Sequence, residues 1–237
     1  FSDRDRILVA VSGGKDSLTM LDLLHRRRQT RETYLLVAAH VQTDHGCGRK
    51  VPDTWLKAWC QERDIPLVTD QIQVAEELES MSRARCFRCA WQRRKALFEM
   101  AERLQCNKLA LGHHMDDFAE TVLLNLLYSS RVEGFEATTR FFDGKLHVIR
   151  PLISLGEQEI ARYSRASGFP IEGKRCPFGQ DSRRAFAKRL LEQARVEGHD
   201  VTLSVYRAVA DYQTKLRWAE ASLGRDSDAE DESHKED

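Results

Sequence analysis

The sequence predicts an α/β fold in which helices cover both faces of a parallel β-sheet, followed by a C-terminal helical extension. Two observations predict it. The first 150 residues alternate short β-rich runs with helical patterns, which is the order that a parallel sheet requires. Beyond residue 155 the patterns are helical only, so we expect this part to pack onto the sheet. A chain of 237 residues suits one large domain, or one domain with a small appendage.

The first two strands are the most clearly marked elements. Ile7–Val11 is a compact apolar run, and the glycine pair at 13–14 turns the chain into a helix over about 16–28. Tyr34–Val41 is a second continuous apolar run, as expected for a strand that is covered on both faces.

The remaining elements follow from helical spacing and from short β-rich runs. Apolar residues recur at helical spacing over 89–105, and 116–128 is a strongly amphipathic helical pattern. The other expected elements are a helix over 53–63 capped by Asp53, strands at 66–69, 108–112 and 147–153 (the last interrupted by Pro151), and helices over about 156–167, 183–197 and 201–222. Right-handed crossovers bring the C-terminal ends of parallel strands to one edge, where we expect ligands to bind.

Charge and cysteine content restrict the class of protein. The formal net charge is zero, but residues 225–237 hold seven acidic and two basic residues, which leaves 35 basic and 30 acidic residues in the body. We predict a disordered acidic tail there, because it has almost nothing apolar to bury. Apolar runs too short for a membrane span, and the lack of a secretory signal, indicate a cytoplasmic protein. Its six cysteines then favour metal or sulfur chemistry, with Cys60 and Cys106 expected as plain buried thiols.

A glycine-rich turn after the first strand is the strongest candidate for a ligand site. It reads Ser12-Gly13-Gly14-Lys15-Asp16-Ser17. The glycines permit close approach of a ligand, and N–H groups at a helix start attract an anion. The serines add hydroxyl donors, Lys15 adds a charge, and Asp16 is a candidate Mg²⁺ ligand. The alternative is a plain Gly-Gly turn capped by Asp16. The motif resembles the signature of PP-loop pyrophosphatases, which split ATP into AMP and pyrophosphate.

A second motif ends the fourth expected strand, at the same edge of the sheet. It reads Gly112-His113-His114-Met115-Asp116-Asp117, followed by Phe118-Ala119-Glu120-Thr121. Paired carboxylates can hold Mg²⁺ and neutralise phosphate charge, although a helix cap is an equal alternative for Asp116. The stretch resembles the second motif of RNA-thiolating PP-loop proteins, in which the second aspartate is catalytic. That resemblance favours Asp117 as the functional carboxylate.

Three further cysteines form a candidate metal site. Cys86 and Cys89 are a Cys-x-x-Cys pair, and Cys176 follows far downstream. The residues alone leave three uses open: an iron–sulfur cluster, a zinc ion with a further ligand, and a redox disulfide. A site with three cysteines leaves one iron of a [4Fe-4S] cluster without a protein ligand.

Several motifs in the same order resemble the 2-thiocytidine tRNA synthetase family. They are Cys86–Leu97 (CFRCAWQRRKAL), His147–Leu155 (HVIRPLISL) and the cysteine after Phe169-Pro170-Ile171, and the likeness extends to about residue 195. The resemblance implies ATP, Mg²⁺ and a [4Fe-4S] cluster as cofactors, with Cys86, Cys89 and Cys176 as cluster ligands. It also implies cytidine 32 of certain tRNAs as the substrate. A related group that makes 2-thiouridine carries extra zinc-finger cysteines at both ends, and this sequence lacks them, which favours cytidine.

Two basic segments surround the candidate cluster cysteines and favour contact with RNA. Residues 80–98 carry six basic residues and no acidic one, and residues 173–189 carry six basic residues and one acidic one. Such clusters suit a phosphate backbone, and Phe87, Trp91 and Phe178 could stack on an extruded base. For any single residue, a solvated helix face or a core aromatic is the more frequent role.

These observations together predict an ATP-dependent tRNA thiolation enzyme. Residues 1–155 would be the nucleotide-binding domain, with adenine against Ala39 and His40 and with Gly112 near the phosphates, and 156–224 would be the helical region with the third cysteine. Lys15, Asp16 and Asp117 would stabilise charge while the C2 carbonyl of the base is adenylated and sulfur replaces its oxygen. The sulfur donor would be a cysteine desulfurase or free sulfide, and a homodimer is compatible with the sequence. The alternatives are a PP-loop ligase with structural zinc and a binding module without ATP chemistry.

Overall fold

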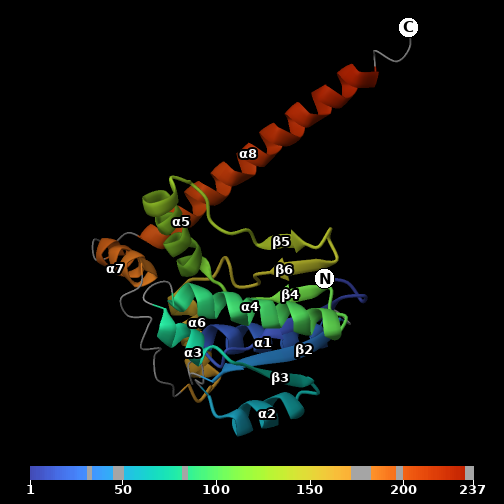
Figure 1. The fold of residues 1–237 in the computed structure, drawn as a ribbon, viewed down its shortest axis with the longest axis vertical. Helices are drawn as coiled ribbons and strands as arrows, with labels where there is room; N and C mark the ends of the chain where they lie inside the picture. Colours follow the sequence, from blue (N-terminus) through green and yellow to red (C-terminus); the bar gives the residue numbers. More distant parts are fainter. Residues whose placement is uncertain (31–33, 45–50, 82–84, 172–182, 196–199, 233–237) are drawn as a thin grey trace.

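The computed structural model describes residues 1–30, 34–44, 51–81, 85–171, 183–195 and 200–232, and the structural statements below concern these residues. One six-stranded sheet in the order β3-β2-β1-β4-β6-β5 lies at its centre (Figure 1). The strands are β1 (Arg6–Ala10), β2 (Leu35–Thr43), β3 (Leu67–Ile72), β4 (Lys108–Ala110), β5 (Thr138–Phe141) and β6 (Leu146–Ile149).

Five of the six strands are parallel, which confirms the predicted fold class. β1 pairs with β2 on one side and with β4 on the other, β2 pairs with β3, and β4 pairs with β6. β5 runs antiparallel to β6 at the sheet edge and was not predicted. Its four residues TTRF alternate exposed and half-buried, so they form no continuous apolar run.

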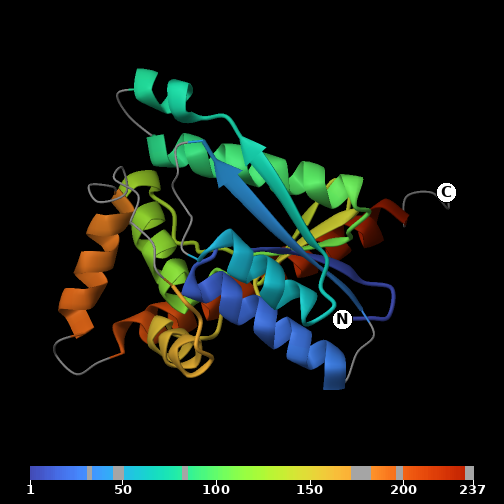
Figure 2. The same ribbon diagram turned by 90° about the horizontal axis from the view of Figure 1, so that it is seen from below.

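Helices cover both faces of the sheet (Figure 2). They are α1 (Lys15–Thr30), α2 (Asp53–Gln61), α3 (Ala75–Ser80), α4 (Arg85–Arg103), α5 (Met115–Ser129), α6 (Glu157–Ala166), α7 (Arg183–Arg195) and α8 (Val201–Glu232). One apolar cluster packs α1, α2 and α6 onto the first face, and a second cluster packs α4 onto the other.

The packing explains why the three central residues of β1 are all apolar. Ile7 and Val9 belong to the first cluster, and Leu8 between them belongs to the second. All three side chains are fully buried, and each contributes roughly 2 kcal/mol by leaving water. A strand that is covered on both faces therefore appears in the sequence as a continuous apolar run.

Two local expectations are wrong. Asp53 is the first residue of α2 rather than its cap, which is Pro52, and its carboxylate accepts a hydrogen bond from Gln42 at 2.9 Å. The disorder predicted from residue 225 onward does not begin there, because α8 continues to Glu232. Residues 225–232 contain neither proline nor glycine, so nothing in them stops the helix. The far end of α8 extends away from the body of the molecule (Figure 1).

The other expected elements are present, with bounds shifted by a few residues. β6 ends at Ile149, before the proline that was expected to interrupt it. The six-residue α3 was not predicted. Among the described helices, none is long and apolar enough to cross a membrane.

Candidate active site at the C-terminal edge of the sheet

Residues 12–17 form the turn that joins β1 to α1. Gly13 has φ of +75°, in the left-handed region that glycine adopts without strain. The Ser17 hydroxyl donates to the Gly14 carbonyl at 3.0 Å and accepts from the Ser12 backbone N at 3.1 Å. The Ser12 and Ser17 hydroxyls lie 3.2 Å apart. The two serines thus stabilise the loop that leads into α1. Backbone N–H groups at the start of a helix can bind an anion.

Gly112, which follows β4, packs directly against this loop. A Cβ at residue 112 would lie 3.2 Å from the backbone N of Ser17 and 3.3 Å from the backbone carbonyl carbon of Asp16. Both atoms belong to the backbone, so a larger residue could fit only by moving the loop. The glycine therefore sets how closely the two motifs approach each other.

His114 joins the second motif to the first. Its Nε2 lies 3.7 Å from the Oδ1 of Asp16 and 3.5 Å from the Oδ2 of Asp117, and its Nδ1 lies 3.6 Å from the Oδ2 of Asp116. Burial alone would lower the pKa of this imidazole, but the three carboxylates outweigh it and raise the pKa. The histidine, which the sequence singled out only as half of a pair, is the centre of the acidic cluster.

The two neighbouring aspartates have different roles. Asp117, at position N3, helps to cap α5, because its Oδ2 accepts a hydrogen bond from the backbone N of the N-cap residue His114 at 3.1 Å. The cap role considered for Asp116 therefore belongs to Asp117. Asp116 is buried and accepts from the backbone N of Glu157 at 2.7 Å and from Arg195. Burial alone would raise the pKa of Asp116, but these donors and His114 hold it well below its usual range.

Helix α7 brings three basic residues to the acidic edge. Arg184 lies 3.6 Å from both Asp117 and Glu120, Lys188 lies 2.9 Å from Glu157, and Arg195 pairs with Asp116. α7 packs on α5, and both lie at the end of the sheet where the parallel strands terminate (Figures 1 and 2). Of these residues, the sequence indicated Arg184 and Lys188 only as part of a basic segment, and it did not indicate Arg195.

Lys15 is paired within the site. Its Nζ lies 2.8 Å from Asp16 and 3.1 Å from Glu157. Burial alone would lower the pKa of Lys15, but the two carboxylates raise it, so the residue is positively charged at neutral pH. Glu157 begins α6, and no local motif in the sequence pointed to it.

Ala39 and His40 lie where β2 passes the end of β1. The Ala39 carbonyl accepts from the Val11 backbone N at 2.8 Å, and the His40 Nδ1 lies 2.6 Å from the Val11 carbonyl. Both residues are buried. They therefore border the chain just before the phosphate loop, at the position where an adenine ring was expected.

The pKa values of His113 and Glu120 differ from those of exposed histidine and glutamate residues. Burial lowers the pKa of His113 to about 4, and the charges of Arg150, Arg184 and Arg94 act in the same direction. The imidazole stacks near Phe135, with ring centroids 5.2 Å apart. Burial and Asp117 raise the pKa of Glu120 to about 7. A neutral imidazole and a protonatable carboxyl thus lie beside Asp117.

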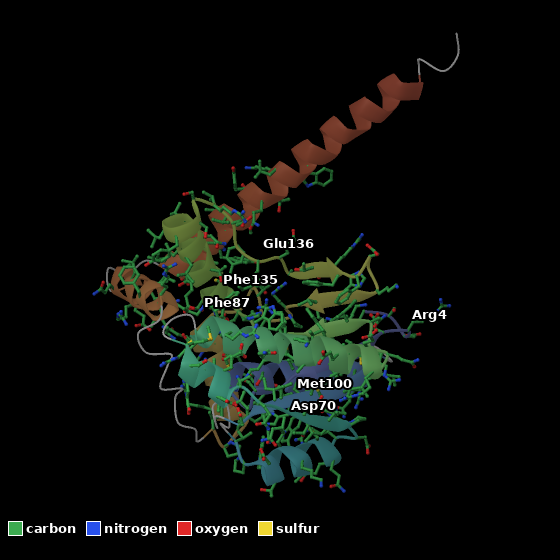
Figure 3. The ribbon with its side chains drawn as sticks, in the orientation of Figure 1. Arg4, Asp70, Phe87, Met100, Phe135 and Glu136 are labelled. Carbon is green, nitrogen blue, oxygen red and sulfur yellow. The ribbon has the colours of Figure 1, made fainter. Side chains whose placement is uncertain are left out.

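Cys86 and Cys89 lie in the first two turns of α4. Cys86 is exposed and Cys89 is half-buried. The neighbouring Phe87 marks the end of α4 nearest α7 (Figure 3). Cys176 lies outside the described residues, so the predicted convergence of three thiols remains a prediction. In the part of the chain that the structure describes, no three His, Cys, Asp or Glu side chains are arranged to hold a metal ion.

The predictions for Cys60 and Cys106 agree with the structure. Cys60 and Cys106 are buried, and burial raises the pKa of both thiols, that of Cys60 to about 11. Both belong to the apolar core clusters. Cys47 and Phe178 lie outside the described residues. Phe87 and Trp91 are exposed, as base-stacking side chains would need to be.

The fold and the phosphate loop define a PP-loop protein, and residues 2–172 match the PP-loop domain family. The U34-tRNA thiolase NcsA from Methanococcus maripaludis, solved with its [4Fe-4S] cluster, has the same fold: the TM-score is 0.73 at 21% identity, over 89% of this chain and 72% of that one. This likeness concerns the fold alone.

Sequence relatives define the family more narrowly. A tRNA-cytidine(32) 2-sulfurtransferase from Geobacter sulfurreducens is 36% identical over 90% of this chain and 84% of its own length. One from Pseudomonas putida is 34% identical over 87% of this chain and 76% of its own. The chain belongs to the tRNA-cytidine(32) 2-sulfurtransferase family.

Proposed function

We propose that this chain is an ATP-dependent tRNA sulfurtransferase that converts cytidine 32 of its tRNA substrates to 2-thiocytidine. One observation carries the proposal: His114 lies within 3.7 Å of Asp16 and 3.5 Å of Asp117, so the phosphate loop and the second motif form one site. Family membership supports the substrate, since the relatives named above are tRNA-cytidine(32) 2-sulfurtransferases.

The reaction would take place in two steps. The C2 oxygen of cytidine attacks the α-phosphorus of ATP, and pyrophosphate leaves. A sulfur atom at the oxidation level of sulfide then adds to C2, and AMP leaves with the original oxygen. The protein's task in both steps is to hold the phosphates and stabilise developing charge.

The residues of the site suit that task. The turn from Ser12 to Ser17 would hold the phosphates through backbone N–H groups and the start of α1. Lys15 would leave its carboxylate partners to contact a phosphate. Asp16 and Asp117 would contact Mg²⁺, which commonly uses one or two carboxylates together with substrate phosphates. Ala39 and His40 would border the adenine, with Gly112 keeping the loop in place.

The cysteines would hold a [4Fe-4S] cluster. Cys86 and Cys89 fit this use, because Cys86 is exposed, Cys89 is half-buried and both lie in the first two turns of α4. Cys176 would be the third ligand. When bound, the cluster would supply an iron without a protein ligand as the site that holds sulfur. The donor of that sulfur would be a cysteine desulfurase or free sulfide, and the protein would act in the cytoplasm, alone or as a homodimer.

Nucleoside mass spectrometry of tRNA tests the proposal. Cells that lack the protein should lose 2-thiocytidine and regain it with the parent gene, but not with Asp117→Asn. Asp211→Asn, at an exposed position on α8, is the matched control and should restore the nucleoside fully. Unchanged 2-thiocytidine in the deletion strain would refute the substrate, and loss of 2-thiouridine instead would indicate the uridine branch.

Two measurements on the purified protein test the chemistry. Pyrophosphate release should require both tRNA and ATP. Protein purified without oxygen should be brown and contain about four irons per chain. A colourless zinc protein would indicate a PP-loop ligase with structural zinc. A protein with a full cluster that releases no pyrophosphate would be a binding module.

A further inference from the structure

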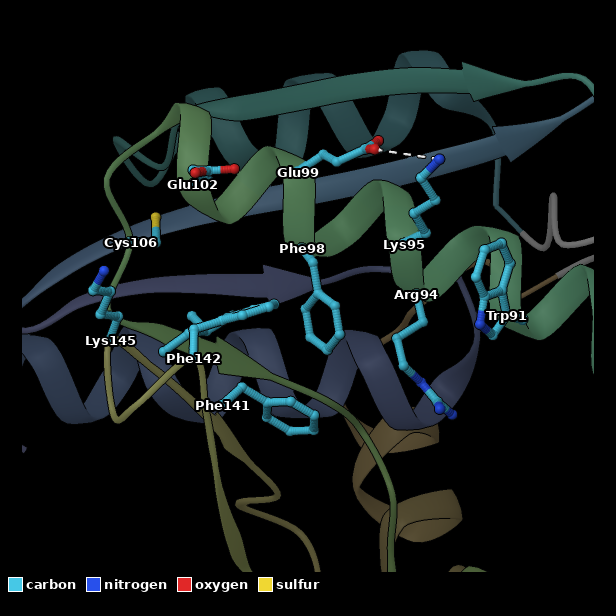
Figure 4. Close-up of a pocket in the computed structure, with 11 residues that line it drawn as sticks. Trp91, Arg94, Lys95, Phe98, Glu99, Glu102, Cys106, Phe141, Phe142 and Lys145 are labelled. Carbon is cyan, nitrogen blue, oxygen red and sulfur yellow. Dashed lines mark ion pairs between the residues drawn. The ribbon is translucent and has the colours of Figure 1, made fainter.

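A cavity of about 540 Å³ lies between α4 and the β5–β6 hairpin, outside the phosphate site. Figure 4 shows its aromatic floor, which Phe98, Phe141 and Phe142 form, and Trp91 further along α4. Its size is within the range of small-molecule binding sites, and its lining is mainly apolar. An apolar, aromatic cavity that is open to solvent indicates a flat apolar ligand group.

The turn that carries Phe142 is unusual in sequence. Phe142 has φ of +53° and Asp143 has φ of +54°, and the Gly144 N–H donates to the Phe141 carbonyl at 3.1 Å. With Gly144 at φ of +83°, three successive residues of the four-residue loop between the paired Phe141 and Leu146 lie in the left-handed region, which glycine, asparagine and aspartate adopt most easily. A bulky residue in the left-handed region costs about 1–2 kcal/mol. The turn therefore retains an aromatic side chain at a position where asparagine would be more stable.

That side chain is part of the aromatic lining of the cavity, which we call the groove. Phe142 is 59% exposed, and its ring centroid lies 5.8 Å from that of Phe98 at an interplanar angle of 84°. Phe98 in turn lies 5.2 Å from Phe141. One face of the Phe142 ring can therefore receive a second planar group without disturbing the core beneath it.

The lining of the cavity carries three basic residues against two acidic ones, Glu99 and Glu102. Arg94 and Lys145 are exposed, and within the described parts of the chain neither has an ion-pair partner. Lys95 is also part of the lining, although it pairs with Glu99 at 3.7 Å. Aromatic rings beside available cations are the combination that binds single-stranded nucleic acid, through stacked bases and neutralised phosphates.

The groove leads to the proposed active site. It follows α4, the helix whose first two turns carry Cys86 and Cys89. Trp91, at the near end of the lining, follows Cys89 by two residues, and the charge of Arg94 contributes to the low pKa of His113. A single RNA strand could therefore contact the groove and the active site at once.

We infer that this groove binds an unpaired nucleobase of the RNA substrate, stacked on Phe142, with the adjoining phosphates at Arg94 and Lys145. This inference rests on the proposed function and adds a second contact, away from the reacting base. RNA-binding proteins hold unpaired loop bases on aromatic side chains in this manner.

Phe142→Asn separates a binding role from a structural one. Asparagine adopts the left-handed φ of residue 142 more easily than phenylalanine does, so the thermal midpoint of unfolding should rise or remain unchanged. The affinity for a tRNA transcript with cytidine at position 32 should nevertheless fall about tenfold in fluorescence anisotropy, because base stacking is lost. Phe142→Trp should retain tRNA affinity. Tyr212→Ala, which removes an exposed aromatic residue on α8, should leave it unchanged.

The outcomes distinguish this inference from the proposed function. Equal tRNA affinity of Phe142→Asn and the parent would overturn the inference, whatever the enzyme's activity. If tRNA affinity is equal but sulfur transfer from a desulfurase is lost, the groove serves a protein partner, and the inference is again wrong. Binding of a short single-stranded RNA that depends on Phe142, in a protein that thiolates no tRNA, would support the groove and refute the function.

Discussion

The Oε1 of Glu157 lies 3.1 Å from the Nζ of Lys15, so the first residue of α6 neutralises the lysine of the phosphate loop. Its Oε2 lies 2.9 Å from the Nζ of Lys188 on α7. One carboxylate thus links the loop after β1 to a helix more than 160 residues later. Burial alone would raise the pKa of Glu157, but the two lysines lower it, so it stays ionised at neutral pH.

Glu157→Gln should lower stability without weakening ATP binding. The amide leaves two lysines without their shared counter-charge, which should cost about 1–2 kcal/mol in the free energy of unfolding. Lys15 is then more available to phosphate, so the Kd for ATP should stay the same or fall. Urea unfolding and isothermal titration calorimetry measure the two effects.

The control for this change is Glu79→Gln, at an exposed position on α3, which should alter neither quantity. Lys15→Ala should raise the Kd for ATP at least about tenfold, the equivalent of about 1.4 kcal/mol. A large loss of ATP affinity in Glu157→Gln would show instead that the carboxylate itself contacts the nucleotide or its metal.

Gly112→Ala should damage the phosphate loop from outside it. The added Cβ would lie 3.2 Å from the Ser17 backbone N, and the backbone cannot rotate away as a side chain can. We expect a loss of about 1–3 kcal/mol in stability and roughly tenfold weaker ATP binding. Gly156→Ala is the matched control, because its Cβ would meet the Glu159 carboxylate at 3.6 Å and the Asp116 carboxylate at 4.0 Å, both ordinary contact distances. Equal ATP affinity in Gly112→Ala and the parent would contradict this account of the loop.

The parts of the site that the sequence predicted are those with a local signal. The apolar run of β1 and the glycines that follow it are adjacent in sequence, so strand, loop and helix could be predicted together. Likewise, the His-His-Met-Asp-Asp run directly follows β4. Parallel-strand topology then implied that both motifs share an edge, and the contacts of His114 agree.

The parts that were missed depend on long-range contacts. Arg195 reaches Asp116 across 79 positions, and no sequence period marks such a pair. Asp117, at position N3 of α5, accepts from the backbone N of the N-cap residue His114, and histidine is not a usual capping residue that would mark this helix start in the sequence. The antiparallel β5 has only four residues and one polar, exposed face, so its pattern was too weak to detect.

Glu120 should make stability depend on pH between about 4.5 and 7. Its pKa rises from the ordinary value of 4.5 to about 7 in the folded protein, because of burial and the charge of Asp117 on α5, against Arg184 and Lys188 on α7. The folded state therefore binds a proton that the unfolded state has lost. The stabilising effect is complete below pH 4.5 and disappears as the pH rises through 7.

Glu120→Gln should remove this slope. The glutamine stays neutral, so the variant should equal the parent near pH 4.5 and exceed its stability at pH 8 by on the order of 2–3 kcal/mol. Urea unfolding at several pH values measures the difference in stability. His114 titrates in both proteins, so its contribution cancels in this difference. Glu133→Gln, at a half-buried position after α5 where the carboxylate pairs with Arg131, should keep the parental slope. Parallel curves for Glu120→Gln and the parent would show that Glu120 is ionised throughout.

Removal of iron should change the reactivity of Cys86 and leave that of the buried Cys60 unchanged. Cys86 is exposed at the start of α4, so it should react with iodoacetamide once a chelator has removed the cluster, and it should be protected in the loaded protein. Cys60 should stay unmodified in both states, because burial raises its pKa to about 11 and leaves about one thiol in a thousand ionised at pH 8. Peptide mass spectrometry after a timed reaction gives both rates. If Cys86 reacts equally fast with and without iron, it is not a ligand of the cluster, and the sulfur site must be sought elsewhere on the chain.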